Sequence, residues 1–192
     1  MLAPVFLVLV YWFGIRIMWP QFQKNVYKDP VYGFSIRYSE EAKPITDKDK
    51  IVLSGYIPVC DPDATLACFV FPSSTFPDSN FSSAGVGVAI LKEFKTEETC
   101  LARRETERSD EGFRAINEAK FKVYSYGEGA AGHHSNGLNY RGFHDDTCYQ
   151  LSTRLNTTVF ENYEPGTITR FDMGQENKLL EKMDEMIASF SF

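Results

Sequence analysis

The stretch from Tyr140 to Asn156, YRGFHDDTCYQLSTRLN, constrains the fold more than any other part of the chain. Its second arm alternates, with Tyr149, Leu151, Thr153 and Leu155 on one side and Cys148, Gln150, Ser152 and Arg154 on the other. This period of two is typical of a half-buried strand. Between the arms, Asp145-Asp146 suits a tight turn, because a short carboxylate can hydrogen-bond its own backbone at positive φ. The stretch therefore predicts the central hairpin of a mostly antiparallel sheet, with one face in the core and the other toward water or a second layer.

Length and charge restrict the organisation of the chain and its partners. The 192 residues are enough for one domain that buries a core without covalent links. The net charge of -6 and the absence of a Lys or Arg run argue against nucleic acid as a partner. We predict a hydrophobic signal or anchor segment over 1–20, a linker over 21–30, and a single α+β domain over 31–192 that is monomeric.

The four cysteines, Cys60, Cys68, Cys100 and Cys148, form no C-x-x-C pair and show no zinc spacing with histidine. In an oxidising compartment we expect Cys60 to pair with Cys68 across a turn rich in Pro and Asp, and Cys100 to pair with Cys148. The sequence alone leaves the other two connectivities open. The alternative is four buried thiols in a cytosolic protein.

Residues 1–19 are apolar except for Arg16. The run before Arg16 is shorter than the roughly 20 residues of a membrane helix, although 17–19 extend it if the arginine reaches the interface. We expect a signal peptide or an uncleaved transmembrane anchor, which makes the membrane a partner. The basic residues that follow the apolar run would keep that side of the membrane segment in the cytoplasm. This orientation conflicts with disulfides in a domain outside the cytoplasm, so we expect a charged segment to precede the apolar run. The residues expected to contact the membrane are Leu2, Phe6, Trp12 and Trp19.

Two helices and one long loop are expected in the remainder of the domain. Thr96 predicts the N-cap of a surface helix through roughly Arg108, with acidic residues in its first turn. The stretch 127–137, GEGAAGHHSNG, is predicted to be a loop. Asp172 and Gln175 predict a capping box for the last helix. That helix has one apolar face, formed by Leu179, Met183, Met186 and Phe190 at helical spacing.

The outline resembles the PsbP-like family. The resemblance rests on 32–36, Tyr-Gly-Phe-Ser-Ile, which opens the domain, on the antiparallel sheet in the middle, and on an amphipathic helix followed by 189–192 as a closing strand. The Phe-His-x-x-x-Cys-Tyr pattern at 143–149 is also similar to uncharacterised bacterial secreted proteins. The resemblance implies an antiparallel sheet flanked by helices, an α/β/α sandwich, in a protein that acts by binding outside the cytoplasm and often at a membrane.

The candidate groups for chemistry are His133, His134, His144, Asp145 and Asp146. If the 127–137 loop folds over the hairpin, His133, His144 and Asp145 could hold a divalent metal such as zinc. The alternative is a solvated Gly-rich loop. A nucleophile formed by Cys148 with His144 would need a thiolate, which a disulfide removes.

We therefore expect a binding or assembly module without catalysis, membrane-anchored or secreted, which would be periplasmic in a bacterium. A protein partner is expected, and no cofactor is required apart from the metal considered above. The alternative function is an extracytoplasmic metal-binding protein or hydrolase that uses the region of the three histidines.

Overall fold

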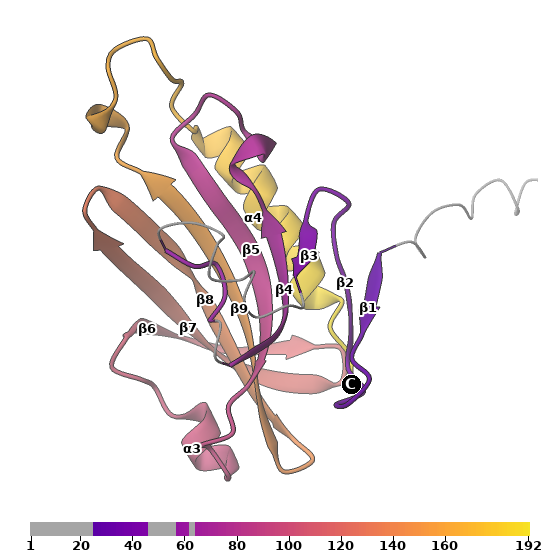
Figure 1. The fold of residues 1–192 in the computed structure, drawn as a ribbon. Coiled ribbons are helices and arrows are strands. Elements are labelled where there is room, and N and C mark those ends of the chain that lie inside the picture. The colour runs from indigo at the N-terminus through magenta and orange to yellow at the C-terminus, as the bar shows by residue number, and fades with distance from the viewer. Residues whose placement is uncertain (1–24, 46–56, 62–63) are drawn as a thin grey trace, which may run out of the picture.

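The computed structural model describes residues 25–45, 57–61 and 64–192. Antiparallel strands dominate the described part of the chain (Figure 1). In chain order the elements are β1 (Val26–Lys28), β2 (Ser35–Arg37), β3 (Lys43–Ile45), β4 (Thr65–Phe71), η1 (Ser73–Thr75), β5 (Phe81–Ile90), α3 (Glu97–Leu101), β6 (Glu107–Ile116), β7 (Ala119–Ala130), β8 (His133–His144), β9 (Thr147–Thr158), η2 (Phe160–Asn162) and α4 (Met173–Ala188).

Seven strands form one sheet in the order β3-β4-β5-β9-β8-β7-β6, and β1 pairs with β2 separately. The predicted central hairpin is confirmed: β8 and β9 pair antiparallel, with His144 opposite Thr147. Asp145 and Asp146 form the turn with φ of 44° and 55°, the positive values that a tight hairpin requires. Strands β6 to β9 follow each other as a meander, and β9 then pairs with β5, which places β9 at the middle of the sheet.

Helix α4 covers one face of this sheet (Figure 1). The predicted capping box is confirmed, because Asp172 accepts from the backbone N–H of Gln175, whose side chain accepts from that of Asp172. The buried residues of the helix are Leu179, Met183, Met186 and Ile187. They pack in one cluster with the odd-numbered face of β9 and with β2, so the main apolar core lies between α4 and the sheet.

The expected α/β/α sandwich is wrong. Among the described residues, α4 is the one long helix on the sheet. Helix α3 has five residues and lies near the lower end of the sheet in Figure 1. Thr96 caps α3 as predicted, but the helix ends at Leu101 and not near Arg108. Residues 103–108 offer no apolar face that could sustain a helix by packing, and from Glu107 the chain pairs with β7 instead. The face of the sheet opposite α4 therefore carries no helical layer in this part of the chain.

The predicted loop over 127–137 is also wrong. Strand β7 continues to Ala130 and β8 begins at His133, with Ala131 and Gly132 as the turn at φ of 50° and 81°. The glycines are needed where backbones approach closely. A Cβ on Gly137 would lie 1.8 Å from the carbonyl oxygen of Thr153 on β9. Glycine here permits strand packing, whereas the sequence pattern indicated a flexible connection.

The boundaries of the domain can be followed only where the structure describes the chain. The predicted signal or anchor segment over 1–20 lies outside the described residues. Strand β1 lies inside the stretch 21–30 that we expected to be a linker, and it pairs with β2. At the other end, Ser191 forms a single β-bridge with Ser35, so the predicted closing strand is reduced to one pair of residues.

Candidate functional site

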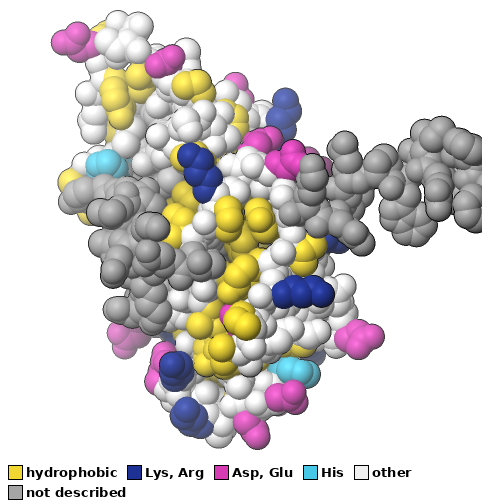
Figure 2. All heavy atoms as spheres, turned by 45° about the vertical axis from the view of Figure 1, so that its right-hand side comes forward, with side chains coloured by type: hydrophobic (Ala, Val, Ile, Leu, Met, Phe, Trp, Pro, Cys, Tyr) yellow, Lys and Arg dark blue, Asp and Glu magenta, His cyan; other side chains and the backbone are white. Residues whose placement is uncertain are grey.

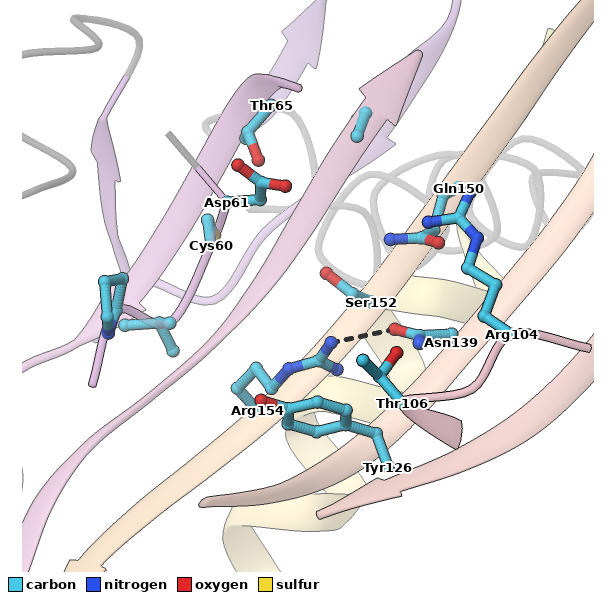
Figure 3. Close-up of a pocket in the computed structure, with 13 residues that line it drawn as sticks. Cys60, Asp61, Thr65, Arg104, Thr106, Tyr126, Asn139, Gln150, Ser152 and Arg154 are labelled. Atoms are coloured by element: carbon cyan, nitrogen blue, oxygen red, sulfur yellow. Dashed lines mark hydrogen bonds between the residues drawn. The ribbon is translucent and has the colours of Figure 1, made fainter. Parts of the chain in front are cut away.

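A pocket of about 280 Å³ lies on the face of the sheet opposite α4. The even-numbered face of β9 and the neighbouring strands form the floor of the pocket. The segment 57–61 forms a wall beside this floor. Figure 3 shows Arg104, Asn139, Gln150 and Arg154 on one side of the opening and Cys60, Asp61 and Thr65 on the other. Most of these groups are polar or charged, in contrast to the apolar core behind the sheet.

Glu107 organises the charges beneath this pocket. The side chain is 2% exposed, and one carboxylate oxygen accepts from Arg141 Nη2 at 2.7 Å and from the backbone N–H of Arg104 at 2.8 Å. The other oxygen accepts from Asn139 Nδ2 at 3.0 Å. Arg141 is 0% exposed and its guanidinium lies over the ring of Tyr124 at 4.6 Å. This buried ion pair joins β6 to β8 and neutralises one arginine.

Arg154 occupies the pocket wall with its guanidinium 3.9 Å from the centroid of the Tyr126 ring. It donates to Asn139 Oδ1 at 2.9 Å, the bond drawn in Figure 3, and to the carbonyl of Thr153 at 2.8 Å. Within the described ranges, no carboxylate lies within ion-pair distance of it. Burial lowers the pKa of Arg154 and raises the pKa of the Tyr126 phenol to about 12. Arg154 thus stays a cation in a place that disfavours charge.

Arg104 is the second arginine that lines the pocket. Its guanidinium lies 4.6 Å over Phe94, and its Nη2 is 3.9 Å from the carboxylate of Glu93, which is 62% exposed. Among the described residues, its Nε and Nη2 have no hydrogen-bond partner, although both atoms are buried. Burial lowers the pKa of Arg104, and the charge of Arg141 adds to the effect. Buried donors of an arginine are normally bonded, so this side chain has hydrogen-bonding capacity that the described part of the chain does not use.

Both disulfides hold the segments that build the pocket. The predicted pairs are confirmed as Cys60–Cys68 and Cys100–Cys148. The first attaches the segment 57–61 to β4, and Asn156 Nδ2 adds a hydrogen bond to the carbonyl of Ile57 at 2.7 Å. The second attaches α3 to β9, just before the stretch that carries Arg104. Two walls without regular strand pairing are therefore fixed covalently.

The histidines do not come together. His133 begins β8 and His144 ends it, so a strand of 12 residues separates them, roughly 35 Å at ordinary strand geometry. His144 Nε2 lies 3.3 Å from Asp145, and its ring stacks on Phe192 at 4.0 Å. The described ranges contain no group of three or more His, Cys, Asp or Glu residues placed to hold a metal ion. Cys148 is disulfide-bonded and offers no thiolate to His144.

The surface carries both charged and apolar groups. Figure 2 shows a band of hydrophobic side chains on the turned face, bordered by Lys, Arg, Asp and Glu. Exposed large apolar residues include Val31 and Met173, and single ones are ordinary on soluble domains. A search of the helices in 25–45, 57–61 and 64–192 finds none long and apolar enough to cross a membrane. The predicted membrane contacts, Leu2, Phe6, Trp12 and Trp19, lie outside these ranges.

Sequence reasoning missed the pocket residues. The even-numbered face of β9 was expected to meet water or a second layer, and it lines the pocket with Gln150, Ser152 and Arg154. A sequence signal for the other charged residues of this region did exist, because Arg104 and Glu107 lie in a stretch without apolar periodicity. Their meeting with Asn139 depends on the pairing of β6, β7 and β8, which the local pattern does not encode.

No protein-family model matches the chain, and no curated protein matches it. A crystal structure of a protein from Bacteroides thetaiotaomicron aligns with 87% of this chain at 10% sequence identity and a TM-score of 0.45. The alignment covers 47% of that protein, so this chain spans about half of its length.

Proposed function

We propose that this protein is an extracytoplasmic binding module that holds a small ligand in the pocket opposite α4 and catalyses no reaction. The observation that carries the proposal is the pocket itself: about 280 Å³, lined by converging polar side chains, with both irregular walls covalently fixed. Ligand sites are usually preformed cavities of roughly 300–1,000 Å³ with a few placed polar groups, so a volume near the lower limit favours a small ligand.

The lining supports binding better than catalysis. None of the three histidines is among the residues that line the pocket, and its cysteine, Cys60, is disulfide-bonded. Arginine guanidinium groups stay protonated and cannot serve as general bases. Ser152 is 9% exposed, and no hydrogen bond from its hydroxyl to a base is found among the described side chains. The groups that remain, guanidinium, amide and hydroxyl, recognise ligands by hydrogen bonds and charge.

The proposed location follows from the disulfides. Two intrachain disulfides are compatible with an extracytoplasmic location, because thiols in the cytosol are kept reduced. We place the domain outside the cytoplasm, anchored by or released from the apolar segment over 1–20, and in the periplasm if the source is bacterial. A protein that acts there by binding could deliver its ligand to a membrane partner.

The proposal is tested by blocking the pocket. Thr106 is exposed at the pocket rim, so Thr106→Trp should fill the opening without disturbing the core, and Asn177→Trp on the exposed side of α4 is the control. The full-length oxidised chain, in a mild detergent, is melted by circular dichroism with a panel of sugars, hydroxy acids, amino acids and nucleotides. A ligand should raise the melting midpoint of the wild type and of Asn177→Trp but not of Thr106→Trp.

The same panel can contradict the proposal. If no compound stabilises the wild type, or if stabilisation survives Thr106→Trp unchanged, the pocket is not a binding site for these classes of ligand. Calorimetric titration then gives the stoichiometry, which should be one ligand per chain. A hydrolysis product in the titrated sample would instead favour the hydrolase alternative.

A further inference from the structure

The charges around the pocket are unequal. Three arginines, Arg104, Arg141 and Arg154, lie around one buried carboxylate, Glu107, which pairs with Arg141. Arg104 and Arg154 line the pocket itself. The carboxylate of Glu93, which is exposed, lies 3.9 Å from Arg104 Nη2. Asp61, on the facing wall, is the carboxylate among the lining residues. The described lining residues, with two arginines and one aspartate, therefore carry an excess of one positive charge in a protein whose net charge is -6.

The hydrogen-bond inventory of the pocket is also incomplete. Among the described residues, Arg104 Nε and Nη2 and Gln150 Oε1 are buried without a hydrogen-bond partner, as are Arg141 Nε and Nη1 outside the pocket lining. Arg104 and Gln150 line the same pocket. Two donors on a positively charged group bond most strongly to an acceptor that is negative, and the amide oxygen needs a donor. A buried polar atom without a partner costs stability unless a ligand supplies that partner.

We propose that the ligand is a small organic monocarboxylate that also bears a hydroxyl or amino group. This inference rests on the proposed function. The carboxylate accepts from Arg104, with Arg154 as the second positive charge, and the hydroxyl or amino group donates to Gln150. One negative charge balances the excess of the described lining residues, whereas a phosphate dianion would exceed it by one.

The test uses small probes that differ in one group. Glycolate has the carboxylate and the hydroxyl, acetate lacks the hydroxyl, and acetamide lacks the charge. Inorganic phosphate represents the other class of anion. Calorimetric titration of the full-length oxidised chain at constant ionic strength should rank glycolate above acetate and phosphate, with no measurable binding of acetamide. Arg104→Gln should weaken glycolate binding by on the order of tenfold or more, because a hydrogen bond to a charged group is lost.

Arg103→Gln is the matched control. Arg103 is exposed on the same segment, donates to the carbonyl of Glu107 and does not line the pocket. Arg103→Gln changes the net charge by the same amount as Arg104→Gln, but it should leave the affinity for glycolate within about twofold of the wild type. The denaturant midpoint of ligand-free Arg104→Gln should stay unchanged or rise, since the variant removes a partly buried cation whose Nε and Nη2 have no hydrogen-bond partner among the described residues. A purely structural arginine would instead lower that midpoint and leave the affinity unchanged.

The outcomes separate the two proposals. If a neutral sugar binds and Thr106→Trp abolishes that binding while glycolate does not bind, the carboxylate inference fails and the pocket remains a ligand site. Tighter binding of phosphate than of glycolate also overturns the inference. If glycolate binding is unaffected by both Arg104→Gln and Thr106→Trp, it takes place elsewhere, and the carboxylate inference fails again.

Discussion

Glu107→Gln should destabilise this protein more than Arg141→Met, although the two residues are partners in one ion pair. Glutamine keeps the volume of Glu107 and one oxygen for Asn139, so the variant removes mainly the negative charge. Arg141, at 0% exposure, then has no counter-charge, and Arg104 and Arg154 add to the positive field. Arg141→Met leaves the carboxylate with its bonds from Asn139 and from the backbone of Arg104.

The expected magnitudes follow from these contacts. Breaking a buried pair and leaving one charge uncompensated costs about 3–5 kcal/mol, and we expect this value for Glu107→Gln. For Arg141→Met the remaining bonds and the nearby arginines should hold the cost to about 1–3 kcal/mol. The double variant should cost less than the sum of the two, with a coupling of about 2 kcal/mol, because no buried charge of the pair then remains. A domain of this size has about 5–15 kcal/mol in total, so all three variants should still fold.

Urea unfolding followed by circular dichroism measures the comparison, with the m value as a check that the transition stays two-state. Thr167→Ser, at an exposed position, serves as a control that should change the free energy of unfolding by less than about 0.5 kcal/mol. Equal losses for Glu107→Gln and Arg141→Met, or a larger loss for Arg141→Met, would refute the argument that positive charge is in excess on this face.

Three further predictions test other parts of the structure. Cys60→Ala with Cys68→Ala should lower the free energy of unfolding by about 2.5 kcal/mol for a sequence separation of 8, and should weaken ligand binding measured by calorimetry, because the wall over 57–61 loses its covalent link. Leu179→Ala, at 1% exposure between α4 and the sheet, should cost about 3 kcal/mol in urea unfolding without changing ligand affinity. The phenol of Tyr126 has its pKa raised to about 12 from 10.0, so its stabilising contribution is present below pH 10 and is lost as the pH rises toward 12. Tyr126→Phe should therefore lose less stability than the wild type across that interval, and an equal loss would count against burial of this phenol.

Several parts of the fold could be predicted from the sequence because they depend on neighbours along the chain. The turn at Asp145-Asp146 depends on the conformational preferences of two residues, and the strand after it on a period of two. The cap of α4 requires Asp172 and Gln175 at fixed spacing. The disulfide Cys60–Cys68 closes a short turn, which the spacing alone makes plausible.

Other parts could not be predicted because they depend on strand register. The glycines at 127–137 have the composition of a loop, and the local pattern does not show that the backbone of β9 approaches Gly137 too closely for any other residue. The missing second helical layer has a similar cause: Thr96 signals a helix start, but nothing local signals that pairing with β7 begins at Glu107. The pocket combines Arg104, Asn139 and Arg154, which are far apart in the sequence and meet through four paired strands.

The failed helix prediction and the candidate site fall on the same residues, and this coincidence has a physical reason. Residues that serve stability alone usually agree with the local pattern, and disagreement concentrates where a sequence is constrained by function. Replacing a buried ion pair by apolar residues of similar volume is often neutral or stabilising for the folded protein. The same is expected for the pair Glu107 and Arg141. The core between α4 and the sheet can supply the apolar stabilisation, which leaves the opposite face able to retain charges that do not maximise stability. We therefore propose that a ligand, and not the needs of folding, accounts for the two arginines that line the pocket on that face.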